Sequence, residues 1–99
     1  MTGFMWACGN DSLEVVHLLM DRYSFVIDQK NNRGFTGFIE ACLMDCLTIV
    51  CLLIDKYPHV IDQKDINGET GYDKLSKDSK LKIHQYISKK RLDIRKPTI

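Results

Sequence analysis

The chain repeats itself with a period of 34 residues, and this period constrains its fold more than any other feature. The triplet Thr2-Gly3-Phe4 recurs at residues 36–38 and returns as Thr70-Gly71-Tyr72. When residues 2–35 are aligned with residues 36–69, about 18 of the 34 positions are identical. A unit of this size buries its apolar faces only against its neighbours, so we expect the copies to stack.

The second copy predicts two helices joined by a tight turn. Thr36 offers a hydroxyl that can cap a short helix, and apolar residues follow at helical spacing as far as Met44. The pattern breaks around residues 44–46. An apolar stripe with steps of three and four residues then runs from Leu47 to Ile54, which is typical of a second, longer helix.

The end of the copy predicts a projecting loop. Pro58 stops the second helix because it cannot donate the next backbone hydrogen bond. Residues 60–69 are mostly polar and contain Asn67-Gly68, a pair that favours tight turns. We therefore predict an extended, hairpin-like loop over these residues.

The order of these residues resembles the ankyrin repeat. The matching segments are Gly34-Phe35-Thr36-Gly37-Phe38-Ile39-Glu40-Ala41-Cys42, Leu47-Thr48-Ile49-Val50-Cys51-Leu52-Leu53 and, in the first copy, Leu13-Glu14-Val15-Val16-His17-Leu18-Leu19. Tetratricopeptide units have the same length, but they consist of two long helices and leave no room for a ten-residue loop. The resemblance implies an all-α fold, an ankyrin-repeat solenoid of helix-turn-helix units with short β-hairpin loops.

The chain departs from the family pattern at several places, and two of them concern the start of the first helix and the turn between the helices. Glycine (Gly3, Gly37 and Gly71) replaces the proline that usually starts the first helix, and glycine starts helices less well. Asp11 and Asp45 replace the glycine between the helices, where aspartate tolerates a positive φ less easily. These changes bear on local stability and leave the expected fold unchanged.

We expect one ankyrin repeat domain over residues 1–91 and a basic C-terminal tail over residues 92–99. The repeats lie at about residues 2–35 and 36–69, and a C-terminal capping repeat lies at residues 70–91. The cap is inferred because polar residues surround a thin apolar stripe, as the outer face of a terminal repeat requires. The stripe consists of Leu75, Leu81, Ile83, Tyr86 and Ile87.

The first copy carries no polar substitutes on its outer face. Its apolar residues are Phe4, Met5, Trp6, Val15, Val16 and Leu18. An exposed terminal repeat needs a polar face, so two hypotheses remain open. Either a segment upstream of this chain is missing, or another molecule covers the face, in which case the chain forms a homo-oligomer through its N-terminal face.

The resemblance implies a partner-binding surface made of the loop tips and the exposed side of each first helix. Carried over position by position, its main residues are Trp6, Asn10, Asn32, Arg33, Phe35, Glu40, Leu43, Met44, Ile66, Asn67 and Lys74, and Met5 and Ile39 belong to the same helix face. Tryptophan is frequent in binding hot spots, and apolar residues at positions 43 and 44 require an explanation if exposed. The alternative is that Trp6 packs locally against Met5 or Leu43.

The implied function is non-catalytic: a scaffold or adaptor module that binds another protein in the cytoplasm or the nucleus. No cofactor is implied. Two alternatives remain. The chain is the C-terminal capping fragment of a longer ankyrin array with no partner of its own, or it is a self-associating module.

Two other interpretations of these residues are a metal site and a catalytic site. Cys42, Cys46, Cys51 and His59 supply zinc-ligand types, but their spacing differs from that of paired-cysteine knuckles. Small reduced thiols on packed helices explain these cysteines better. The chain has no glycine-rich phosphate loop and no nucleophile motif near its histidines, so we expect no enzyme activity.

The overall charge of the chain does not favour binding to nucleic acid or to a membrane. The formal net charge is +1, and the longest apolar run, residues 47–54, is far shorter than a membrane span. The basic cluster Lys89-Lys90-Arg91 is short and is interrupted by Asp93 before Arg95-Lys96. Cations at the end of a solvated helix explain it, so we expect neither partner.

Overall fold

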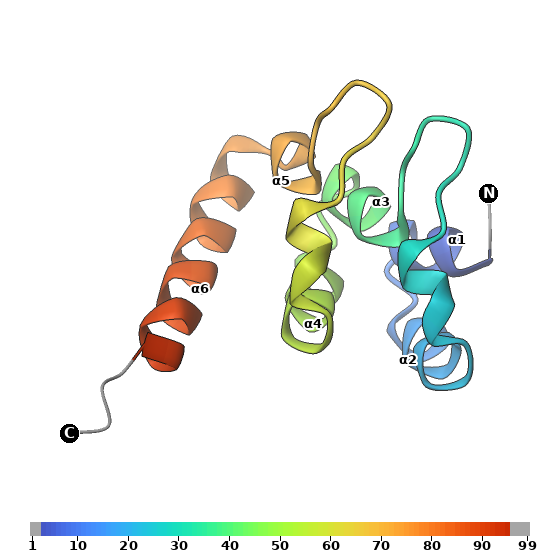
Figure 1. The fold of residues 1–99 in the computed structure, drawn as a ribbon, viewed down its shortest axis with the longest axis horizontal. Helices are drawn as coiled ribbons and strands as arrows, with labels where there is room; N and C mark the ends of the chain where they lie inside the picture. The colour runs from blue at the N-terminus through green and yellow to red at the C-terminus, as the bar shows by residue number, and fades with distance from the viewer. Residues whose placement is uncertain (1–2, 96–99) are drawn as a thin grey trace.

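The computed structural model is mostly helical in the part of the chain that it describes, which comprises the backbone of residues 3–95 and the side chains of residues 3–90 (Figure 1). The α-helices are α1 (Gly3–Gly9), α2 (Leu13–Arg22), α3 (Gly37–Leu43), α4 (Leu47–Lys56), α5 (Gly71–Lys74) and α6 (Lys77–Arg95), and the 3-10 helices are η1 (Ser24–Asp28) and η2 (Pro58–Asp62). No strand occurs among these residues. The prediction of an all-α fold is confirmed.

The helices form three units in line, with α1 and α2 in unit 1, α3 and α4 in unit 2, and α5 and α6 in unit 3 (Figure 1). The short helices α1, α3 and α5 pack against one another in succession, and each contacts the longer helix of its own unit. Loop 1 (residues 29–36) and loop 2 (residues 63–70) project to the side opposite the longer helices. The molecule is elongated, at 46 × 30 × 20 Å.

The start of α3 and the turn after it follow from local chemistry. The Thr36 hydroxyl accepts a hydrogen bond from the backbone N–H of Ile39 at 3.3 Å, which confirms the predicted cap. Asp11 and Asp45 occupy the turns between paired helices with φ of 58° and 55°. Glycine is the residue that adopts this left-handed conformation most easily, so aspartate adopts it here at a cost.

The predicted extended segment begins later than expected. Helix α4 ends at Lys56, before Pro58 as predicted, but the next residues form the 3-10 helix η2. Val60 on this helix is fully buried, and this anchorage in the core prevents an extended path. Loop 2 then closes with a single antiparallel bridge between Lys64 and Thr70, so a hairpin with full strands is absent from the described residues.

The units are held together by the close approach of each first helix to the next. A Cβ atom on Gly37 would collide with the Phe4 ring and would lie 3.0 Å from the Cys8 sulfur. A Cβ on Gly71 would lie 2.7 Å from the Phe38 ring. Phe4 and Phe38 are both buried, so neither ring has room to retreat. The glycines at these two positions are therefore required by packing, whatever they cost as helix starters.

A polar bridge joins unit 1 to unit 2. The Gln63 carboxamide donates to the Ile27 carbonyl at 3.0 Å and to the Asp28 carboxylate at 2.9 Å. Its oxygen accepts the hydroxyl proton of the buried Thr36 at 2.7 Å. These bonds satisfy groups that are partly withdrawn from water and fix loop 2 against η1.

Unit 3 differs from the other two. Its first helix, α5, has four residues, and α6 has 19 and continues to Arg95, past the boundary expected at residue 91. Ile83 is buried against the core, but the expected stripe is wrong at Leu81, which is 59% exposed. Residues 96–99 of the predicted tail lie outside the described residues, and so do the side chains of residues 92–95.

We expect Gly37→Ala and Gly71→Ala to lower the free energy of unfolding by about 1–3 kcal/mol each, because the added methyl group overpacks the contact between units. Gly3→Ala is the matched control, since a Cβ there meets nothing within 4 Å. Urea denaturation of the three variants measures the effect. Equal stability of Gly37→Ala and Gly3→Ala would contradict the packing explanation.

Candidate binding surface

The two loops are built by the same device at equivalent positions. In loop 1 the Asn31 carboxamide oxygen accepts backbone N–H bonds from Arg33 at 2.8 Å and from Phe35 at 3.1 Å. In loop 2 one carboxylate oxygen of Asp65, 34 residues later, accepts from the backbone N–H groups of residues 67 and 69 at 2.8 and 3.0 Å. One side chain therefore holds each turn and presents its tip in a fixed conformation.

The loops are also joined to each other. The backbone N–H of Ile66 donates to the carbonyl of Arg33 at 3.0 Å, and the Lys30 ammonium donates to the Lys64 carbonyl at 2.9 Å. The predicted tip residues Asn32, Arg33, Ile66 and Asn67 are all exposed. Ile66 is 70% exposed, so the edge formed by both tips carries an apolar side chain among polar ones.

Lys74 is engaged within the protein. Its ammonium lies 2.9 Å from the Asp65 carboxylate and 2.8 Å from the Glu69 carboxylate, and 5.2 Å from the centre of the Phe35 ring. The Glu69 and Asp65 hydrogen bonds raise the pKa of Lys74, and the Lys74 hydrogen bond is the main cause that lowers the pKa of Asp65. Lys74 therefore fastens loop 2 to α5 and offers little charge to a partner.

Four residues expected to be exposed are buried: Phe35, Glu40, Met5 and Ile39. The ring of Phe35 lies beneath the Lys74 ammonium. Glu40 is 8% exposed because α1 and α3 approach closely; a Cβ on Gly9 would be in ordinary van der Waals contact with it, at 3.7 Å from the carboxylate. The prediction of exposure is wrong for these residues.

The remaining predicted residues on α1 and α3 are exposed, whereas Lys74 on α5 is only partly exposed. Trp6 is 54% exposed, Leu43 44% and Met44 58%, and Asn10 is exposed and donates from its side chain to the Trp6 carbonyl at 2.9 Å. Packing against its neighbours therefore leaves more than half of Trp6 accessible.

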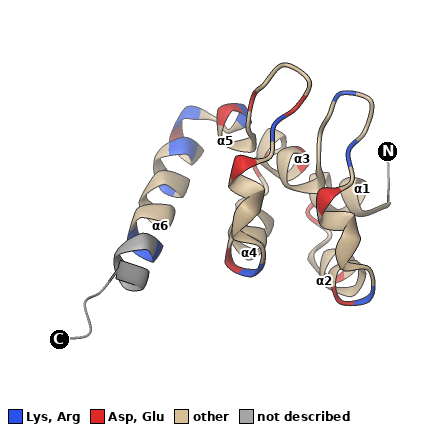
Figure 2. Ribbon diagram, in the orientation of Figure 1, with Lys and Arg blue, Asp and Glu red and all other residues tan. Residues whose placement is uncertain are grey.

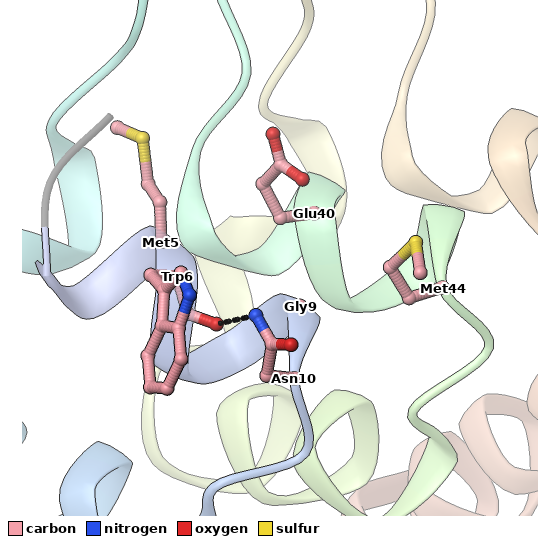
Figure 3. Close-up of a pocket in the computed structure, with 6 residues that line it drawn as sticks. All are labelled: Met5, Trp6, Gly9, Asn10, Glu40 and Met44. Atoms are coloured by element: carbon pink, nitrogen blue, oxygen red, sulfur yellow. Dashed lines mark hydrogen bonds between the residues drawn. The ribbon is translucent and has the colours of Figure 1, made fainter.

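A hollow of about 210 Å³ lies between α1 and α3 (Figure 3). It is lined by Met5, Trp6, Gly9, Asn10, Glu40 and Met44. Figure 3 shows the Glu40 carboxyl between the two methionines, with Trp6 and Asn10 on the α1 side. The Asn31 carboxamide donates to this carboxyl at 3.5 Å, a long hydrogen bond. Burial raises the pKa of Glu40, and the charge of Arg33 opposes that effect.

The cysteines show no sign of activation. Burial raises the pKa of the Cys8 thiol to about 12 and raises that of Cys42 further. Cys46 and Cys51 also have raised pKa values, chiefly through burial, and all four thiols are free. Since the thiolate is the reactive form, these side chains are poor nucleophiles at neutral pH. In the part of the chain that the structure describes, no group of three or more metal-ligating side chains is close enough to hold an ion.

Basic residues lie along α6, away from the loops (Figure 2). Lys90 forms an ion pair with Asp55, which also accepts the Tyr86 hydroxyl proton at 2.5 Å. The rest of the basic cluster, from Arg91 to Lys96, lies outside the residues whose side chains are described. Among the described helices, none is long and apolar enough to cross a membrane.

The chain matches no model of a known protein family, and it matches no curated protein. Its resemblance to ankyrin repeats therefore rests on its own residues.

We expect Asp65→Ala to destabilise the protein more than Asp65→Asn. Asparagine keeps the oxygen that accepts two backbone bonds, as Asn31 does in loop 1, and loses only the ion pair with Lys74. Because the pKa of Asp65 is lowered, the advantage of the wild type over Asp65→Asn is present at neutral pH and declines as the pH falls through that lowered pKa.

Thermal unfolding of the wild type and both variants, from neutral to acidic pH, measures these effects. A difference between the wild type and Asp65→Asn that grows as the pH falls would contradict the assignment. Equal losses for the two variants would show that the backbone bonds contribute nothing.

Proposed function

We propose that this chain is an ankyrin-repeat module that binds another protein without catalysing a reaction. The internal repeat and its residue order support the family. The stack of helix pairs, with both loops projecting from the side of the short helices, supports the architecture (Figure 1). We place the module in the cytoplasm or the nucleus, and it needs no cofactor for this function.

The observation that carries the proposal is the exposure of large apolar side chains on α1, α3 and loop 2. Trp6, Leu43, Met44 and Ile66 are each exposed by 44–70%. Exposed apolar area is stabilised by burial in a complex, and tryptophan and methionine are enriched in protein interfaces. The elements that carry these side chains are fixed by the glycine contacts and by the loop hydrogen bonds, so the surface is preformed.

The double variant Leu43→Ser/Met44→Ser tests the proposal. We expect affinity capture with the wild type to enrich a specific protein, and the double variant to bind that protein, once purified, at least about tenfold more weakly. Leu81→Ser on α6 is the control, because Leu81 is equally exposed but lies on another surface. Equal affinity of the double variant and the wild type would contradict the proposed surface. Failure to capture any protein would favour a capping fragment of a longer array.

A second candidate function is self-association through the outer face of unit 1. Phe4, Met5 and Val16 of the expected N-terminal face are buried within the unit, but other apolar residues remain accessible. The exposed residues there are Leu13, Val15, Leu18, Tyr23 and Phe25. They lie on α2, on η1 and on the residue that joins them, at the end of the stack farthest from α6 (Figure 1).

Sedimentation velocity over a wide concentration range tests self-association. The candidate predicts a dimer that forms with rising concentration and that Leu18→Asp abolishes, because a charge in an apolar interface is costly. Leu81→Asp on α6 is expected to leave the dimer intact. A wild type that remains monomeric at every concentration would eliminate this candidate and leave the protein-binding module.

A further inference from the structure

Glu40 lines the hollow between α1 and α3, and among the described residues no ion pair holds its carboxyl, although the charge of Arg33 acts on it. Its residue surface is more than nine-tenths buried, yet its carboxyl faces an open space (Figure 3). The hydrogen bond that the structure shows to it is the long one from Asn31, at 3.5 Å. A carboxylate withdrawn from water is stabilised strongly when a cation pairs with it.

The remaining walls of the hollow suit a flat cation with an aliphatic stem. Trp6 supplies an aromatic surface, and Met44 supplies a flexible thioether; both are more than half exposed. Asn10 donates its side-chain N–H to the Trp6 carbonyl, so its side-chain oxygen remains as an acceptor at the rim. The volume of about 210 Å³ is below the usual range for small-molecule pockets and suits a single side chain.

We propose that this hollow receives one arginine side chain of the partner protein. Its guanidinium group donates hydrogen bonds to the Glu40 carboxylate and stacks on Trp6, and its aliphatic stem packs against Met44. The inference rests on the proposed protein-binding function and names the chemistry that one part of the surface recognises. Arginine fits better than lysine because it is planar, less strongly hydrated, and able both to pair with a carboxylate in two-point fashion and to stack on an aromatic ring.

The repeat shows why the site occurs once in the described stack. The positions equivalent to Glu40 are Trp6 in unit 1 and Lys74 in unit 3, since each lies 34 residues away. The corresponding place between α3 and α5 therefore carries an ammonium group, already held by the carboxylates of Asp65 and Glu69. A second arginine would be repelled there, so the surface selects one arginine at one place.

Trp6 is the only tryptophan of the chain and lines the hollow, so its fluorescence reports occupancy directly. The probes are the blocked tripeptides acetyl-Gly-Arg-Gly-amide, its citrulline counterpart and its lysine counterpart. Citrulline has nearly the shape of arginine and no charge. We expect a saturable fluorescence change with the arginine peptide, and at least about tenfold weaker binding of the citrulline peptide.

Glu40→Gln is the decisive variant because it keeps the size of the side chain and removes its charge. We expect it to weaken arginine-peptide binding at least about tenfold, whereas Glu14→Gln, which removes an exposed acid on α2, leaves binding unchanged. Circular dichroism verifies that both variants are folded. Equal binding of the arginine and citrulline peptides, or full binding by Glu40→Gln, would overturn the inference. Equal binding of arginine and lysine peptides would overturn the choice of arginine.

The same variant separates this inference from the proposed function. If the captured partner depends on Leu43 and Met44 but binds Glu40→Gln and the wild type equally, the protein-binding function stands and the arginine site is wrong. If both sets of substitutions weaken binding of the partner, the inference and the function are supported together.

Discussion

The contact of an aromatic ring with a glycine on the next unit sets the spacing of the whole stack. Phe4 lies where a side chain on Gly37 would be, and Phe38 repeats the contact at Gly71. Because no Cβ intervenes, the short helices approach closely and in register. This approach brings the two loops within hydrogen-bonding distance of each other and forms the hollow between α1 and α3 that Glu40 lines.

On this side of the stack, some charged side chains pair with each other within the protein, and others are available to a partner. Around loop 2, Asp65 and Lys74 satisfy each other, and the turn is rigid as a result. On α3, Glu40 is about as buried as Asp65, but the hydrogen bond that it accepts from Asn31 is long. Burial raises the pKa of Glu40. A buried carboxylate without a strong partner lowers the free energy of unfolding of the free protein. A cation of a bound protein that pairs with this carboxylate removes that cost.

Much of the fold follows from the sequence, because the period is read directly from the chain and because the Thr36 cap and the proline after α4 act over a few residues. The exposure of single side chains does not follow, because it depends on neighbours in another copy. Glu40 is buried where α1 packs closely against α3, and the Phe35 ring lies beneath the Lys74 ammonium. The exposure of Trp6, Leu43 and Met44 was predicted from the resemblance to ankyrin repeats, whereas the hollow beside Trp6 and Met44 depends on how α1 and α3 pack.

The central claim, that another protein binds across α1, α3 and the loop tips, is tested most directly by amide chemical-shift mapping. The chain has 99 residues and is small enough for complete assignment by NMR. On addition of the captured partner, we expect the largest shifts at the loop tips and along the exposed residues of α1 and α3, including the indole N–H of Trp6. Shifts confined to α2, α4 and α6 would contradict the account and would place the binding surface on the opposite side of the stack.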